Sequence, residues 1–427
     1  MPVTRHEIAF AVRNHTLKQT ALVAYRAGSD LIGKGAFLVI TVAAARRLSQ
    51  EAFGIFSLAS TLGWILAIAT DFGIQLHLAR VVARTPADAG RLLRAWVRLR
   101  LTTSAIAVAA TAVIVFALPA ARPYAAAMVL ITTMYIVGGL IEFLHYFYRG
   151  LSRSDVESSL TLGQRMGTLA LALLVLWVKP DLTVLAAAML APVVATFAYS
   201  LRFALRIAGS SQGPTPPVMR EWRRDVMPIA AGVVLSALYF RVDVLLVELW
   251  SGTQAVALYN AVFRLVEAMR LFPAAVLAVA LPILFRATNT KPLVQVSAIV
   301  TLFALAGTAA AEILSPWIVP FLYGSSYAAG VPAFRVLLLA FPLMSLNYAL
   351  THQLIGWNGQ RAYAVICGAA FLFNVALNAF LIPSFSIVGA AWSTLWTEMV
   401  LSGGCIGALV LRFARPTGER AVAMEAS

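Results

Sequence analysis

The charged side chains that could do chemistry begin in one apolar stretch near the start of the chain. Arg26, Asp30 and Lys34 recur every four residues within residues 21–45, and this spacing places them on one face of a helix. The stretch is otherwise apolar and is long enough to cross a bilayer. A charged side chain near the middle of a membrane costs about 2.5–3.5 kcal/mol on insertion scales. We therefore expect this face to turn toward other helices or a water-filled cavity.

A second group of charges lies in two later apolar stretches that run in opposite directions. Counted along the chain, four of them fall at similar depth near the middle of the membrane: Arg241, Asp243, Glu267 and Arg270. Arg264 and Glu267 are three residues apart and share one helical face. The spacing thus predicts a polar layer between neighbouring spans.

Two interpretations of these charges are open. They form structural ion pairs between helices, or they line a cavity that binds an anion, because arginine is well suited to phosphate and carboxylate groups. Seven cations and about six acids fall within predicted spans, more than helix pairing requires. We therefore predict a cationic cavity whose substrate-binding residues are Arg26, Lys34, Arg241, Arg264 and Arg270. The candidates for binding a coupling proton or cation are Asp30, Asp71 and Glu267.

Two further pairs are candidates for contact with a sugar. Trp392 and Trp396 share a face of the last apolar stretch, and Asn374 and Asn378 share a face of the one before it. Tryptophan near a membrane surface also belongs to the interfacial aromatic belt. The tryptophan pair is therefore open to either role.

The composition is that of a polytopic membrane protein. Of 427 residues, 61% are hydrophobic and 12% are charged, and the mean hydropathy is +0.84; soluble chains are about 25% charged. The two cysteines lie in separate apolar stretches, so we expect no disulfide framework and no metal site. HExxH, Walker A and CxxC patterns are absent, and there is no Ser-centred GxSxG elbow. We therefore predict a transporter without a cofactor rather than an enzyme, and residues 1–20 do not suggest a cleavable signal peptide.

About twelve apolar stretches have the length of roughly 20 residues that a bilayer requires. They cover residues 22–45, 52–79, 101–119, 124–147, 160–178, 182–204, 227–250, 254–284, 293–314, 331–354, 362–382 and 387–411. The connection 315–330, with its prolines and Gly324, is the least regular. The sequence predicts an all-α protein.

Basic residues set the expected orientation. Of the 33 Lys and Arg residues, 22 fall in segments on the side of the two termini, 4 on the other side and 7 within spans. The positive-inside rule places both termini in the cytoplasm of a cell bounded by this membrane. The excess of basic residues on the cytoplasmic side and their contact with anionic lipid thus account for the net charge of +15. We therefore expect no nucleic-acid partner.

A Gly/Ser/Pro-rich stretch at residues 209–217 divides the chain in half. The predicted parts are an amphipathic cytoplasmic segment or disordered basic tail (1–21), a six-helix lobe (22–208), a cytoplasmic linker (209–226), a second six-helix lobe (227–412) and a cytoplasmic tail (413–427). AFGIFSLAS (52–60) resembles AVALYNAVF (255–263) at an offset of 203. This repeat favours two pseudo-symmetric lobes around a central site.

Four segments carry a family resemblance. RRLSQEAFGIFSLAS (46–60), DFGIQLHLAR (71–80), RVDVLLVELWSGTQAVALYNAVFRLVEAM (241–269) and LIPSFSIVGAAWSTLWTE (381–398) resemble bacterial polysaccharide-biosynthesis membrane proteins, the Wzx-type flippases for lipid-linked oligosaccharides. These belong to the multidrug/oligosaccharidyl-lipid/polysaccharide exporter (MOP) superfamily. The resemblance implies two six-helix lobes in a V around a cationic lumen, in the bacterial cytoplasmic (inner) membrane.

The same resemblance implies a function. Such proteins move an undecaprenyl-diphosphate-linked repeat unit to the periplasmic or outer leaflet by alternating access, for O-antigen, capsule or exopolysaccharide synthesis. The expected partners are this polyprenyl-diphosphate-linked glycan, the lipid bilayer, and a polysaccharide polymerase with other assembly proteins. The related lipid II flippases commonly have fourteen spans, so lipid II is the second choice of substrate.

Two other functions remain open at this point. A multidrug or cation antiporter of the same fold would have an acidic, aromatic-lined cavity, whereas cations at least match acids within these spans. A glycosyltransferase or polymerase would normally need a large acidic loop outside the membrane. The longest connection, roughly 205–226, is small and basic.

Overall fold

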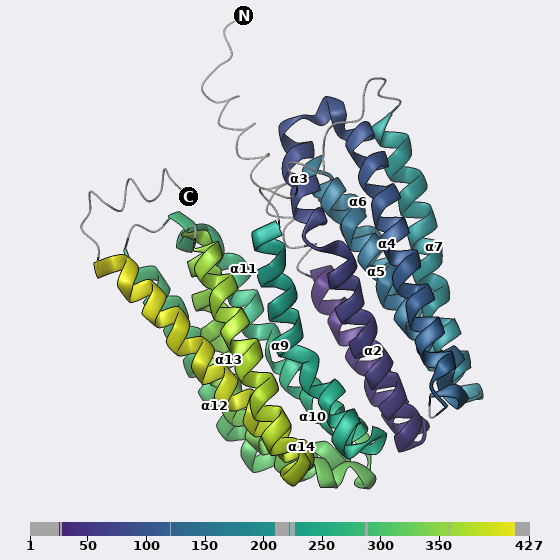
Figure 1. The fold of residues 1–427 in the computed structure, drawn as a ribbon, viewed down its shortest axis with the longest axis vertical. Helices are drawn as coiled ribbons and strands as arrows, with labels where there is room; N and C mark the ends of the chain where they lie inside the picture. The colour runs from purple at the N-terminus through teal and green to yellow at the C-terminus, as the bar shows by residue number, and fades with distance from the viewer. Residues whose placement is uncertain are drawn as a thin grey trace, which may run out of the picture.

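The computed structural model describes residues 25, 28–119, 121–209, 222, 227–286, 289–357 and 359–414. Throughout this part of the chain, the regular elements are helices, and they form two groups that lie side by side (Figure 1). The predicted segment 1–21, most of the linker 209–226 and most of the tail 413–427 fall outside the described residues. The all-α prediction is confirmed.

The first lobe contains a helix over Gly28–Arg47 and six labelled helices. They are α2 (Gln50–Asp71), α3 (Ile74–Arg84), α4 (Ala89–Ala117), α5 (Ala125–Gly150), α6 (Ser154–Val178) and α7 (Leu182–Ala208). The second lobe consists of α9 (Met227–Ser251), α10 (Thr253–Met269), α11 (Leu271–Arg286), α12 (Lys291–Tyr323), α13 (Val331–Gly356) and α14 (Gln360–Ala414). Helix α2 meets α9 and α10 along the line where the lobes join (Figure 1).

Ten helices in the described ranges are long and apolar enough to cross a membrane. One of them, α14, has 55 residues, roughly 80 Å of helix against a hydrocarbon core of about 30 Å. Its backbone leaves helical geometry at Ser386 (φ 50°, ψ −131°), and a Cβ on Gly389 would lie 2.4 Å from the carbonyl oxygen of Leu381. The chain therefore folds back here, so α14 is two spans, as the sequence predicts.

Two predicted spans are broken in the structure. The stretch predicted over 52–79 ends as α2 at Asp71, because Phe72 (φ 42°) and Gly73 (φ 77°) adopt left-handed backbone before α3 begins. The stretch predicted over 254–284 is divided at Arg270 into α10 and α11. Conversely, α12 continues through Pro316 and Pro320 to Tyr323, and only Gly324 (φ 101°) ends it.

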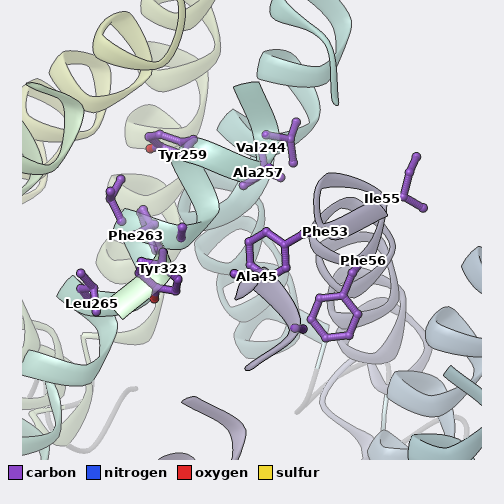
Figure 2. Close-up of a cluster of buried hydrophobic side chains, with 14 of the residues drawn as sticks. Ala45, Phe53, Ile55, Phe56, Val244, Ala257, Tyr259, Phe263, Leu265 and Tyr323 are labelled. Atoms are coloured by element: carbon purple, nitrogen blue, oxygen red, sulfur yellow. The ribbon is translucent and has the colours of Figure 1, made fainter. Parts of the chain in front are cut away.

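The lobes pack closely at the end where α2 begins, which we call the closed end. Side chains of both lobes, including Phe53 of α2 and Ala257 of α10, form one buried cluster there (Figure 2). A Cβ on Gly54 would lie 2.1 Å from the carbonyl oxygen of Thr253, so only glycine allows this approach of α2 to α10. Arg46 also donates hydrogen bonds to the carbonyls of Leu322, at 2.8 Å, and Phe321 at the end of α12.

The repeated segments 52–60 and 255–263 lie on α2 and α10, the helices that meet at this end. From the closed end, the two groups of helices diverge toward the end at which α7 finishes and α9 starts (Figure 1). The fold is thus a V whose arms are the two lobes.

Candidate functional site

A cavity of about 770 Å³ lies between the two lobes. Its lining includes the second half of α2, from Trp64 to Asp71, and the first half of α9, from Ala230 to Phe240. These are the halves away from the closed end. The cavity therefore occupies the diverging part of the V, and its volume suits a sizeable small-molecule ligand.

The charged side chains on the lining differ between the lobes. The wall formed by the second lobe, here called the C wall, carries Arg264, Glu267 and Arg270. The wall formed by the first lobe, the N wall, carries Asp30, Lys34, Asp71, Glu142, Glu157 and Arg165. Cations thus outnumber carboxylates on the C wall, and carboxylates outnumber cations on the N wall.

On the C wall, one carboxylate joins two helices. Glu267 of α10 accepts from Arg241 of α9 at 2.5 Å through Oε1, and from Arg264 at 2.8 Å through Oε2. Arg241 is buried behind the lining and also donates to Asn260 Oδ1 at 3.2 Å. Arg264 lies one turn before Glu267, so the helix itself places the two side chains together.

Aromatic rings support the arginines of this wall. The Arg241 guanidinium lies 4.7 Å from the Phe263 ring, and that of Arg270 lies 4.7 Å from the Phe240 ring. Arg264 lies 5.0 Å from the ring of Phe37, which belongs to the first lobe. Stacking of this kind holds a guanidinium in place while its nitrogens stay available as donors. Within the described chain, Arg270 has no carboxylate in ion-pair contact.

On the N wall, most carboxylates face cations that stand behind the lining. Arg149 holds Glu157 at 2.5 Å and Glu142 at 3.0 Å. Asp71 lies 3.6 Å from Arg100, which is fully buried in α4. Asp30 is exposed to the cavity and, among the described residues, has no ion-pair partner. The acidic character of this wall is therefore largely neutralised from within the lobe.

The predicted site residues divide into four groups. Those on the lining are Lys34, Arg264, Arg270, Asp30, Asp71 and Glu267. Arg241 lies directly behind the lining, and Arg26 falls outside the described residues. The predicted sugar contacts on α14 do not reach the cavity in this conformation: they are Trp392, Trp396, Asn374 and Asn378.

Contacts on α14 explain where the last group lies. Trp392 and Trp396 are 38% and 46% exposed on the surface of the lobe, as expected of side chains that face lipid. Asn378 donates to Asn374 at 2.8 Å, and Asn374 donates to Thr397 at 3.1 Å. The asparagine pair thus joins the two halves of α14 to each other.

Sequence reasoning missed three basic residues at this site. They are Arg165, which lies on the lining, and Arg100 and Arg149, which stand behind it. A signal was present for Arg149, because it follows Glu142 by two helical turns and so shares its face. No spacing within α4 indicates that Arg100 faces Asp71, since that contact joins two different helices.

Comparison with solved structures identifies the fold. A multidrug resistance MATE family transporter of the MOP superfamily, in an inward-facing conformation, has a TM-score of 0.71 at 13% identity, covering 89% of this chain and 96% of its own. The lipid II flippase MurJ, in an inward closed conformation, has a TM-score of 0.72 at 12% identity, covering 89% and 86%. At these identities, the likeness shows the fold alone.

A third similar structure concerns pocket charge. It is a MOP superfamily transporter from Pyrococcus furiosus, described as having a reversed polarity of the binding pocket, with a TM-score of 0.61 at 14% identity, covering 95% and 96%.

No curated protein matches the sequence. The model of one family does match, over residues 21–288, more than half of the chain. This multi-pass membrane protein with the fold of MOP transporters thus belongs to the polysaccharide biosynthesis protein family.

Proposed function

We propose that this protein is a flippase for an undecaprenyl-diphosphate-linked oligosaccharide repeat unit, which it moves from the cytoplasmic to the outer leaflet of the inner membrane for surface polysaccharide synthesis. The observation that carries the proposal is the cavity between the lobes, whose C wall presents Arg264 and Arg270. Charged and hydroxyl groups cost several kcal/mol each when they enter hydrocarbon unpaired. A polar cavity that opens to alternate sides replaces their hydration throughout the crossing.

The diphosphate is assigned to the C wall. Arg264 and Arg270 are placed to donate to phosphate oxygens, and Arg241 supports them from behind. Lys34 and Arg165 face the same space from the other lobe. Arg26, one helical turn before Asp30, stays part of the predicted site by its sequence position.

The glycan is assigned to the N wall. Thr161, Gln164 and Thr168 of α6 present hydroxyl and amide groups to the cavity, and such groups pair with sugar hydroxyls. The lining carboxylates Asp30, Asp71 and Glu267 are the candidates for binding a coupling proton or cation. The prenyl chain stays in lipid, and a polymerase and other assembly proteins are the proposed partners in the membrane.

The orientation follows from the basic residues. With both termini in the cytoplasm by the positive-inside rule, the diverging end of the V faces the cytoplasm and the closed end faces outward. This conformation is then the one that receives the substrate.

A vesicle assay tests the proposal. The purified protein is reconstituted with a fluorescent undecaprenyl-diphosphate-linked oligosaccharide, and the fraction that reaches the opposite leaflet is followed with a membrane-impermeant quencher. We expect wild type to accelerate transfer and Arg264→Ala to abolish most of it. Arg335→Ala, which removes an arginine outside the cavity lining, is the control. Transfer no faster than in protein-free vesicles would contradict the proposal.

The same assay separates the alternative lipid substrate. Fluorescent lipid II carries the same diphosphate and prenyl chain but a different head group, so selectivity depends on the N wall. Faster transfer of lipid II than of the oligosaccharide would make lipid II the substrate.

A specific observation favours a second candidate function, export of organic cations. Four carboxylates face the cavity from the N wall, as a cation site requires. However, Asp71, Glu142 and Glu157 already face arginines within their lobe, so little of this charge is free. Saturable uptake of a fluorescent cation such as ethidium into the vesicles would support this function.

A further inference from the structure

The carboxylate of Glu267 sits where an anionic ligand of the C wall would sit. Its two oxygens each bind a different guanidinium, Arg241 at 2.5 Å and Arg264 at 2.8 Å. The two arginines come from different helices, α9 and α10. A phosphate group presents pairs of oxygens to arginines in the same manner. The side chain of Glu267 therefore occupies a two-arginine anion site of its own protein.

The site offers more donors than this one carboxylate uses. Arg264 Nε and Asn260 Nδ2 are buried and have no hydrogen-bond partner among the described residues. Arg270, six residues beyond Arg264, also lines the cavity and has no ion-paired carboxylate in the described chain. Buried polar groups are normally paired. A diphosphate, with more oxygens and more charge than a carboxylate, would match this set of donors better than Glu267 does.

Glu267 is also accessible, unlike the arginine behind it. Its side chain is 23% exposed and lines the cavity, whereas the side chain of Arg241 is 5% exposed. An incoming anion can therefore reach the carboxylate and replace it, while Arg241 remains in place. Without any counter-anion, a buried arginine such as Arg241 would be strongly destabilising.

From these contacts we infer, on the basis of the proposed function, that Glu267 is an internal counter-anion that the diphosphate of the substrate displaces. In the empty carrier, Glu267 neutralises Arg241 and Arg264. When the diphosphate binds, it takes over these two guanidinium groups, and the carboxylate turns toward the cavity. When Glu267 returns, it competes with the diphosphate and promotes release.

In this role, Glu267 weakens binding of the diphosphate and speeds turnover. Removal of its charge should raise affinity for the diphosphate and slow its release. A merely structural ion pair would behave differently, because its loss would lower stability and affinity together. The two roles are thus distinguished by the direction of the change in affinity.

The first experiment measures binding of geranylgeranyl diphosphate to the full-length protein in nanodiscs by fluorescence titration. We expect Glu267→Gln to lower the Kd about tenfold, within the usual range for coupling between competing interactions. The matched control is Glu312→Gln, which removes the carboxylate of a glutamate–arginine pair outside the cavity lining and is expected to leave the Kd unchanged. A Kd for Glu267→Gln equal to or above that of wild type would overturn the inference.

Two further measurements keep the result decisive. Glu267→Asp retains the charge but shortens the side chain, so it also releases an arginine; if the amide variant does not fold, the aspartate variant must show the lower Kd. In the vesicle assay, Glu267→Gln should lower both KM and kcat for the oligosaccharide. A lower kcat with an unchanged KM would count against displacement.

Failure of the inference can be told apart from failure of the proposed function. If wild type binds the diphosphate and Arg264→Ala does not, but Glu267→Gln is no tighter, only the role of Glu267 is wrong. If wild type and Arg264→Ala bind it equally, or neither binds it, the anion site itself is wrong.

Discussion

The two walls of the cavity use arginine in opposite ways. On the C wall, Arg264 and Arg270 face the cavity themselves, and the lining carboxylate of Glu267 pairs with Arg264 and with Arg241 behind it. On the N wall, Arg100 and Arg149 stand behind the lining and hold carboxylates that face the cavity. The lobes have similar helical architecture, yet one presents mainly cations and the other presents mainly carboxylates, most of them paired with arginines of the same lobe. The difference shows that the charge a substrate meets depends on whether the arginine or its carboxylate partner lines the cavity.

The strongest way to break this comparison is to remove the cations of each wall separately. Arg264→Ala with Arg270→Ala should reduce transfer of the lipid-linked oligosaccharide in vesicles by about a hundredfold, because charge-assisted hydrogen bonds to the diphosphate are lost. Lys34→Ala with Arg165→Ala should reduce it by less than about tenfold. Equal losses from both pairs would show that the walls do not differ in function.

The relative position of the C wall and the N wall depends on close packing of the lobes at the closed end. Gly54→Ala places a methyl group 2.1 Å from the carbonyl oxygen of Thr253, so we expect the free energy of unfolding to fall by about 1–3 kcal/mol. The control is Gly403→Ala in α14, where nothing lies within 4 Å of the new Cβ. Alanine is the better helix former, so this control should be neutral or stabilising. The midpoint of thermal unfolding in detergent measures both, and equal shifts would contradict close packing at Gly54.

A smaller effect is expected from the hydrogen bonds that join the lobes at the closed end. Arg46→Ala removes the donors to the Leu322 and Phe321 carbonyls, worth about 0.5–1.5 kcal/mol for each bond. The closed end should then open more often, and a cysteine introduced as Ala257→Cys, buried in wild type, should react faster with a water-soluble maleimide. Arg122→Ala, whose arginine donates to Phe116 within the same lobe at 3.3 Å, is the control. An unchanged labelling rate would argue against Arg46 as a link between the lobes.

The smallest effect is expected on the N wall. Glu142 is held by Arg149 at 3.0 Å and lies 3.6 Å from His145, so its charge is largely matched from within the lobe. Glu142→Gln should therefore change the Kd for geranylgeranyl diphosphate by less than about threefold. A change as large as that expected for Glu267→Gln would show that the N wall also binds the diphosphate.

Much of the architecture could be predicted from the sequence, because the hydropathy of each span depends only on the residues of that span. The all-helical class and the positions of most spans follow from hydropathy and length. The break at Phe72–Gly73 did not follow, because the predicted stretch 52–79 runs through it and only backbone geometry reveals the left-handed turn.

The site was less predictable because it depends on contacts between helices. Arg264 and Glu267 could be paired from their spacing on one helix. The contact of Arg100 with Asp71 joins α4 to α2, and counting depth along α4 gives no indication of it. The surface position of Trp392 and Trp396 likewise depends on which face of α14 packs inward, and the buried face there carries Ser393, Thr397 and Glu398.

The most direct test of the account is to locate the diphosphate. A polyprenyl diphosphate analogue with a photoreactive group next to its phosphates is cross-linked to the reconstituted protein, and the labelled peptides are mapped by mass spectrometry. We expect labels on α9, α10 and the start of α11, around Arg241, Arg264 and Arg270. Labels confined to α2, α5 and α6 would place the diphosphate on the N wall and contradict the central claim.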